Sequence, residues 1–155
     1  MSDPGEIAIR PALDDDLAGI FALERAGFPD PWPVELLASE LRHPDSFLLV
    51  ACAGESAPLG YASFRTAVDE AELLRLAVEP AVRKRGLGRR LLEAGCARLG
   101  ERGFVRCFLE VRDENRPAIA LYESSGFRLA GRRKGYYRDG MDALVYLRAI
   151  AAPPP

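Results

Sequence analysis

The chain has 155 residues, of which 48% are hydrophobic and 28% are charged, a composition typical of one globular domain with a sizeable core. Its net charge of -2 and pI of about 5.5 leave no overall basic footprint for nucleic acid, and no apolar run is long enough to predict a membrane span. The first residues lack an apolar signal core and the three cysteines are widely separated, so we expect a cytoplasmic protein with reduced thiols.

The first half of the chain predicts a strand, two helices and three further strands. Alternation at Ile7 and Ile9 indicates a short strand, and Asp14–Asp16 place acids where a helix dipole favours them. We expect that helix to end near Gly27 and a second helix to cover Val34–Leu41. The strands expected next are Phe47–Ala53 and Leu59–Val68, joined as a hairpin, and then Leu73–Val78.

The second half predicts a long helix, a strand, a short helix and a closing hairpin. The long helix follows Gly88 and runs to about Arg102, with Gly103 as its stop. The later elements are expected at Phe104–Val111, Ala118–Ser124, Phe127–Tyr136 and Asp142–Leu147, the last two around the turn pair Asp139-Gly140. This order predicts a single α/β domain over residues 1–148, with a mixed central sheet of about seven strands flanked by about four helices. Residues 149–155 read as a flexible, proline-rich tail.

The stretch Leu73–Leu92 combines a strand, a basic turn with two glycines, and the start of a helix. Pro80 cannot donate to a sheet ladder, so the strand should end just before it. Gly86 and Gly88 lack a Cβ atom, which lets phosphates approach the free amides at a helix N-terminus. The stretch therefore indicates a polyphosphate site at the end of a central strand. The alternative is a solvated basic turn that caps an ordinary helix.

Two common phosphate loops do not match this turn. A nucleoside-triphosphate loop requires Gly-Lys followed by Ser or Thr, but two arginines follow Gly88. A dinucleotide loop requires a third glycine where Leu91 stands. The remaining pattern, Arg83-x-x-Gly86-x-Gly88, resembles the coenzyme A pyrophosphate loop of the GCN5-related N-acetyltransferases (GNAT).

A second segment, Leu109–Phe127, resembles the strand, loop and helix that close the coenzyme A site in that superfamily. The positions that carry the resemblance are Asn115, the Ala-Leu-Tyr that ends at Tyr122, Gly126-Phe127, Leu76–Pro80 and Gly135–Tyr137. Together they resemble the RimI group, whose members acetylate the N-terminal amine of a small-subunit ribosomal protein. The resemblance covers Ile7–Leu147.

The resemblance implies acetyl-CoA as the cosubstrate, Glu110 as the general base and Tyr122 as the general acid. Backbone groups of Leu76–Val78 would bind the pantetheine arm and the acetyl carbonyl, and the turn would hold the pyrophosphate. The residues implied to bind the coenzyme are Leu76, Ala77, Val78, Arg83, Lys84, Arg85, Gly86, Leu87, Gly88, Arg89 and Asn115.

The chemistry of acetyl transfer requires such groups independently of any resemblance. The reaction needs a neutral amine, a polarised carbonyl and a protonated leaving thiolate. The backbone N–H of Val78 can polarise the carbonyl, a carboxylate can take the amine proton directly or through one water, and a phenol can protonate sulfur. Glu110 and Tyr122 fit the last two tasks.

Each candidate also has a purely structural explanation. Glu110 could pair with Arg106 or Arg112 on the strand surface, and Tyr122 could be a core aromatic stacked with Ile119. His43, the only histidine, stands between Arg42 and Pro44 at a helix end and reads as a surface residue. Cys96 and Cys107 fall on apolar faces, so a Cys/His nucleophile is not supported, and no cluster has metal-ligand spacing.

Three features could shape the acceptor site. They are the proline-punctuated loop Phe28–Pro33 with the lone Trp32, the acids Asp69, Glu70, Glu72 and Glu79, and the pair Tyr136-Tyr137. The loop could equally be a packed connector, the acids could be solvated, and the tyrosines could pack on the last hairpin.

We therefore expect an enzyme that transfers acetyl from acetyl-CoA directly to the N-terminal alanine amine of a small-subunit ribosomal protein. No direct contact with nucleic acid or membrane is expected. The alternatives are the same fold acetylating a small-molecule amine or a protein lysine, and a coenzyme A-binding regulatory module without turnover.

Overall fold

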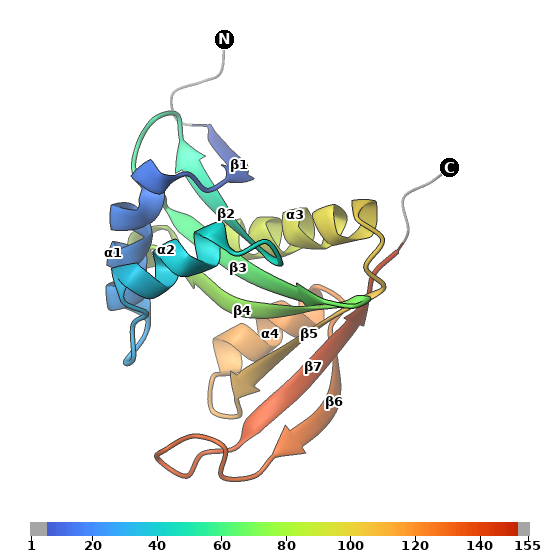
Figure 1. Cartoon of the computed structure of the whole chain (residues 1–155). Helices are drawn as coiled ribbons and strands as arrows, with labels where there is room; N and C mark the ends of the chain where they lie inside the picture. The colour runs from blue at the N-terminus through green and yellow to red at the C-terminus, as the bar shows by residue number, and fades with distance from the viewer. Residues whose placement is uncertain (1–5, 152–155) are drawn as a thin grey trace.

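A computed structural model of the chain describes residues 6–151, which form one seven-stranded sheet with two α-helices on each face (Figure 1). The first five elements are β1 (Ile7–Pro11), α1 (Leu17–Gly27), α2 (Val34–Arg42), β2 (Ser46–Ala53) and β3 (Gly60–Ala67). The others are β4 (Glu70–Val78), α3 (Leu87–Glu101), β5 (Arg106–Arg112), α4 (Arg116–Ser124), β6 (Arg128–Arg133) and β7 (Ala143–Ala149). This confirms the predicted fold class and element order. Within the described residues, no helix has the length and apolarity needed to cross a bilayer.

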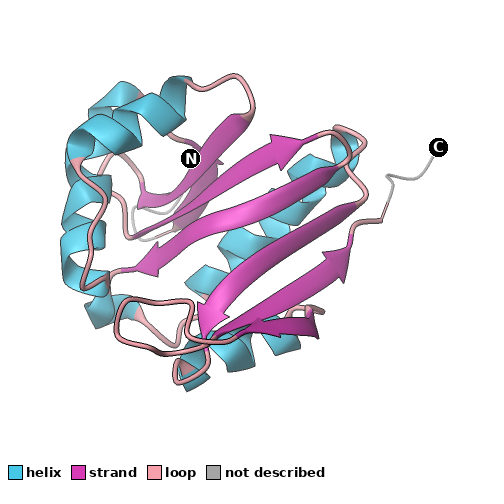
Figure 2. Ribbon diagram, turned by 60° about the horizontal axis from the view of Figure 1, so that its bottom comes forward, coloured by secondary structure: helices cyan, strands magenta, loops and turns pink. Residues whose placement is uncertain are grey.

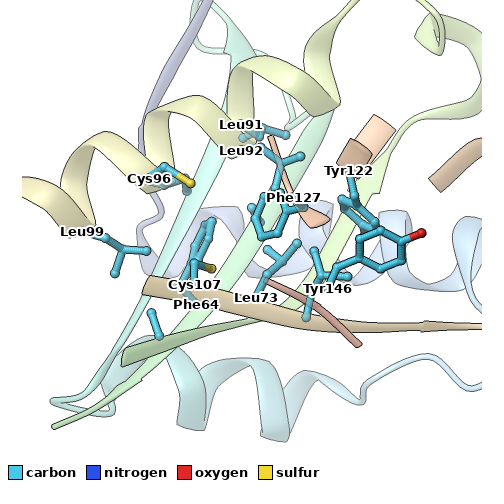
Figure 3. Close-up of a cluster of buried hydrophobic side chains, with 14 of the residues drawn as sticks. Phe64, Leu73, Leu91, Leu92, Cys96, Leu99, Cys107, Tyr122, Phe127 and Tyr146 are labelled. Carbon is cyan, nitrogen blue, oxygen red and sulfur yellow. The ribbon is translucent and has the colours of Figure 1, made fainter. Parts of the chain in front are cut away.

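Figure 2 shows how the helices flank the sheet, and an apolar core lies on each of its two faces. The larger core packs α3 and α4 against the sheet, and Figure 3 shows Leu91, Leu92 and Leu99 of α3 within it. The smaller core places Ile20 of α1 and Leu37 of α2 against the other face. Burying one such side chain contributes about 1.5–3 kcal/mol, so both helix layers are held mainly by their apolar stripes.

The strand order is β1-β2-β3-β4-β5-β7-β6, which places β4 at the centre of the sheet. β4 and β5 are parallel, and their ladder covers only Glu70–Glu72 opposite Arg106–Phe108. Beyond that point no ladder pair joins the two strands in the described structure. The carboxyl half of β4 is therefore paired with β3 alone, and a split opens between β4 and β5 at the end where α3 begins.

β4 contains a bulge that changes which side chains face which core. Ser63 of β3 pairs with Arg75 and Phe64 pairs with Leu73, so Leu74 is an extra residue without a partner. Before the bulge, Leu73 points into the α3–α4 core. After it, Ala77 packs in the α1–α2 core, so Arg75 faces α1 as well.

The end of the chain differs from the prediction. β7 extends through Ala149, which pairs with Arg106, and the Ile150 N–H donates to the carbonyl of Val105 at 2.8 Å. The predicted tail at 149–155 is thus wrong for its first two residues, because a sheet ladder continues there. The rest of it, from residue 152, lies outside the described residues. The last hairpin also has a long loop, since β6 ends at Arg133 and β7 begins at Ala143.

Replacing Gly95 by Ala should destabilise the protein, because α3 lies too close to the sheet there for a methyl group. A Cβ atom at Gly95 would lie 2.2 Å from Cζ of Phe64, whose ring stacks on Phe47. We expect a loss of about 1–3 kcal/mol in urea unfolding, the usual range for overpacking. Gly131→Ala is the matched control, because a Cβ atom there meets nothing within 4 Å. An unchanged midpoint for Gly95→Ala would contradict the packing described.

Candidate active site

The turn between β4 and α3 contains two residues with left-handed backbone. Lys84 has φ of 67° and Gly86, the N-cap of α3, has φ of 80°. The N–H of Arg90 donates to the carbonyl of Gly86 at 3.0 Å as the first bond of the helix. The amides of residues 87–89 therefore lack an intrahelical acceptor, and no other bond to them is recorded in residues 6–151. This is the geometry that favours an anion at a helix N-terminus.

The basic side chains of this turn divide into two groups. Lys84, Arg85 and Arg89 are exposed, and none of them forms an ion pair within the described structure. In contrast, Arg83 folds back so that Nε donates to the carbonyl of Val78 at 3.2 Å, and Arg90 Nη2 donates to the carbonyl of Ile7 at 2.7 Å. The first group remains available to a phosphate, whereas Arg83 and Arg90 brace the turn against β4 and β1.

The two glycines of the motif have different roles. A Cβ atom on Gly86 would meet nothing within 4 Å, so this glycine is required by its left-handed backbone. A Cβ atom on Gly88 would lie 3.0 Å from Cδ2 of Leu121, so this glycine allows α3 to pack closely against α4. Sequence analysis assigned both glycines to phosphate access alone.

The backbone of Leu76 and Val78 faces the split between β4 and β5. The N–H of Glu79 donates to the carbonyl of Leu59, and Tyr61 pairs with Ala77. In an antiparallel ladder alternate residues direct their N–H and C=O groups to the same neighbour, so the groups of Ala77 point toward β3. Those of Leu76 and Val78 point away from β3, toward the side where β5 has already diverged.

Glu110 lies on β5 on the face opposite the α3–α4 core, because its neighbours Leu109 and Val111 are buried in that core. Its carboxylate pairs with Nε of Arg133 at 3.0 Å, and its side chain is 18% exposed. The partner is thus neither Arg106 nor Arg112. Sequence reasoning missed Arg133 because β6 reaches β5 only through β7, an order that no local pattern encodes.

A second carboxylate lies near Glu110. Glu72 of β4 is half-buried, and desolvation together with the negative charge of Glu110 raises the pKa of its carboxyl group. Hydrogen bonding to Glu110 and the charge of that carboxylate also raise the pKa of the Tyr136 phenol. Glu110 therefore belongs to a polar cluster built from β4, β5 and the segment after β6.

Tyr122 of α4 is buried in the α3–α4 core, with its ring edge-on to Phe127 at 6.0 Å between centroids (Figure 3). Burial raises the pKa of the Tyr122 phenol well above its usual value, so the hydroxyl stays protonated. Tyr122 and Glu110 thus lie on opposite faces of the sheet.

Asn115 is the N-cap of α4, where its Oδ1 accepts from the N–H of Ala118 at 3.3 Å. Its amide nitrogen is a donor and is not used by this cap. The residue can thus hold the helix start and still bind a ligand.

Three of the acids predicted near the acceptor are engaged elsewhere. Asp69 and Glu70 lie at the amino end of β4, far from Val78, and both contact Arg106. Glu79 accepts from the N–H of Ala81 at 2.9 Å. These contacts favour the alternative for these three, that they are ordinary surface acids, because Asp69 and Glu70 stand at the start of β4 and Glu79 caps a short 3-10 turn.

Within residues 6–151, the structure forms no site for the other chemistries considered, a Cys/His nucleophile or a metal. His43 Nδ1 accepts from the N–H of Asp45 at 3.0 Å. Burial raises the pKa of Cys96 to about 11, and raises that of Cys107 further, so both thiols stay protonated and inert. No group of three metal-ligating side chains comes together in the described residues. A shallow hollow of about 500 Å³ beside Gly126, Leu129 and Leu147 contains none of the predicted site residues.

Known proteins resemble this chain over most of its length. The profile of the Acetyltransferase (GNAT) family matches residues 17–127. The [ribosomal protein bS18]-alanine N-acetyltransferase of Escherichia coli is 36% identical over 139 residues, which cover 88% of this chain and 93% of that protein. The N-alpha-acetyltransferase RimI of Mycobacterium tuberculosis is 39% identical over 129 residues, 80% of this chain and 79% of that protein. The crystal structure of the E. coli ribosomal-protein-S18-alanine N-acetyltransferase superposes with a TM-score of 0.86 at 32% identity, covering 96% of this chain and 97% of that one.

The chain therefore belongs to the GNAT family of acetyltransferases. It is an N-acetyltransferase, and acetyl-CoA is its cosubstrate. The residues present suit that cosubstrate: within residues 6–151, three unpaired cations and three free amides surround the turn, and the backbone N–H groups of Leu76 and Val78 face the split.

Replacing both Lys84 and Arg85 by Ala should weaken acetyl-CoA binding with little effect on kcat. Charge-assisted hydrogen bonds contribute about 1.5–3 kcal/mol each, so KM for acetyl-CoA should rise at least about tenfold. The difference should shrink at high salt, because exposed charges are screened. The control is the double variant Arg25→Ala and Arg128→Ala, two exposed cations on other elements. Equal KM values in both double variants would contradict the assignment of the turn.

Proposed function

We propose that this enzyme acetylates the N-terminal amine of a protein in the cytoplasm, with the N-terminal alanine of a small-subunit ribosomal protein as its acceptor. The support is twofold. The E. coli relative that aligns over 88% of the chain is named for that reaction on ribosomal protein bS18. The proposal is also supported by a carboxylate, Glu110, and a phenol, Tyr122, that lie on opposite faces of the sheet.

That opposed pair is the observation on which the proposed mechanism depends. The acceptor amine would approach from the Glu110 face and attack the acetyl carbonyl, so that the C–N bond forms as the C–S bond breaks. Glu110 would take the amine proton, directly or through a water, and the N–H of Val78 would stabilise the oxyanion. Tyr122 would donate its hydroxyl proton to the leaving sulfur from the other face. Asn115 and the basic turn would hold the coenzyme.

Free energy favours an α-amine over a lysine as the acceptor. At pH 7, deprotonating a lysine costs about 4–5 kcal/mol, whereas an α-amine costs about 1 kcal/mol. A single carboxylate base, Glu110 paired with Arg133, suits the α-amine because its deprotonation costs less free energy. The same fold acetylating a lysine or a small-molecule amine is the alternative activity, and a coenzyme A-binding module without turnover is the non-enzymatic one.

Acceptor preference can be tested with two peptides of the same sequence, both containing a lysine. One peptide begins with a free alanine, and the other has its α-amine blocked by a formyl group. Mass spectrometry after incubation with acetyl-CoA should locate the acetyl group on the free alanine, and the blocked peptide should stay unmodified. Acetyl on the lysine of both peptides would contradict the proposal, and binding of acetyl-CoA without transfer would favour the module. Ribosomal proteins from cells with and without this chain extend the same measurement to the natural acceptor.

Replacing Tyr122 by Phe should lower kcat by about 100-fold or more, the usual contribution of a general acid, and leave KM for acetyl-CoA within about twofold. Because burial raises the pKa of this phenol, its ionisation should cause no loss of wild-type activity between about pH 8 and 10. Tyr146→Phe is the control, since Tyr146 lies in the same core and its hydroxyl donates to Glu123 at 3.1 Å. A kcat equal to wild type for Tyr122→Phe would remove this role.

A further inference from the structure

Glu24 of α1 is a fully buried carboxylate with four hydrogen bonds. Arg75 donates to it from Nη2 at 2.7 Å and from Nε at 3.2 Å. The N–H of Trp32 donates at 2.7 Å, and the hydroxyl of Tyr61 is the fourth donor. Burying an ion pair gives no guaranteed gain in stability over an apolar core. The arrangement therefore points to a geometric role, because it ties α1, β3, β4 and a loop to one point.

The β4 bulge is what brings Arg75 to this point. In a regular strand, Leu73, Leu74 and Arg75 would alternate, and Arg75 would face the α3–α4 core together with Leu73. With the bulge, its guanidinium lies on the α1 face, one residue before Leu76, and its side chain is 17% exposed.

The same guanidinium holds the loop between α1 and α2. Its centre lies 3.8 Å from the ring centroid of Phe28 and 5.0 Å from that of Trp32, both within cation–π range. Nη2 also donates to the carbonyl of Asp30 at 2.9 Å. One arginine thus contacts three residues of a loop that Pro29, Pro31 and Pro33 already stiffen.

The loop lies on the acceptor side of the split. Gly27, at the end of α1, is within 4.0 Å of Cβ of Ala77 and 3.9 Å of Arg83 Nη2, measured from an ideal Cβ position. Arg75 and Glu110 are on the same face of the sheet, because both point away from the α3–α4 core. Phe28 and Trp32 are only half-buried, so part of each ring remains open to solvent beside β4.

We propose that Arg75 and Glu24 are positioning residues for the acceptor: they hold the Phe28–Pro33 loop as a rigid aromatic wall against which the first residues of the acceptor peptide pack. The inference rests on the proposed function for the identity of the acceptor. It assigns to this pair control of acceptor binding, separate from acetyl-CoA binding, which is assigned to the backbone of β4 and the turn at Gly86.

The test is Arg75→Lys, which keeps a cation for Glu24 but removes the planar group that stacks on the rings. The matched control is Arg65→Lys, because Arg65 of β3 likewise pairs with a buried glutamate, Glu40 of α2, and has no recorded contact with the loop in the described structure. KM for an alanine-initiated peptide should rise about tenfold or more in Arg75→Lys and stay near wild type in Arg65→Lys. KM for acetyl-CoA should stay within about twofold in both. An unchanged peptide KM in Arg75→Lys, whatever its melting temperature, would overturn the inference.

A second variant and a binding measurement separate this inference from the proposed function. Phe28→Leu leaves the Glu24–Arg75 pair in place and removes one ring, so it should raise the peptide KM with little loss of stability.

Trp32 is the only tryptophan, so its fluorescence reports on the loop directly. Peptide added with coenzyme A should change that fluorescence in wild type, and Arg75→Lys should weaken the apparent affinity about tenfold. If wild type binds the peptide without acetylating it, the proposed function fails and this inference stands; if the peptide leaves Trp32 fluorescence unchanged, the inference fails even when acetylation occurs.

Discussion

The structure depends on the early end of the ladder between β4 and β5. Two parallel strands at the centre of the sheet pair over three residues each and then diverge. Buried backbone groups normally find hydrogen-bond partners, yet the N–H groups of Leu76 and Val78 turn toward a strand that is no longer adjacent. A ligand with its own amide groups can take the place of that missing strand. The carboxyl end of β4 leads directly to the turn at Gly86, so the same ligand can reach the helix N-terminus with its phosphates.

The two faces of the sheet carry different chemical groups. On the α3–α4 face, burial keeps the Tyr122 phenol protonated in an apolar core. On the other face, Glu110 lies in a polar cluster with Arg133, Glu72 and Tyr136. The proposed proton acceptor and the proposed proton donor thus lie on opposite faces of the sheet. The arrangement suits a reaction in which one proton is removed and another is supplied on opposite sides of a reacting carbon.

Local patterns were enough to predict the element order, the turn at Gly86 and the positions of Glu110 and Tyr122. They did not predict the bulge at Leu74, because a bulge is defined by register against β3 and not by the strand's own residues. Arg75 therefore read as an ordinary strand residue. A signal for Glu24 did exist, since it occupies the apolar stripe of α1 with Ile20 and Leu23, where a lone acid requires a buried partner.

The central claim is that acetyl-CoA occupies the split and the turn, and amide chemical shifts can test it directly. The 17.0 kDa protein is suited to assigned 15N spectra. Titration with acetyl-CoA should move the amides of Leu76, Val78 and residues 87–89 most, with smaller shifts for Ala77, whose N–H points to β3. Shifts concentrated at the hollow beside Gly126 and Leu129, with the turn unaffected, would contradict the account.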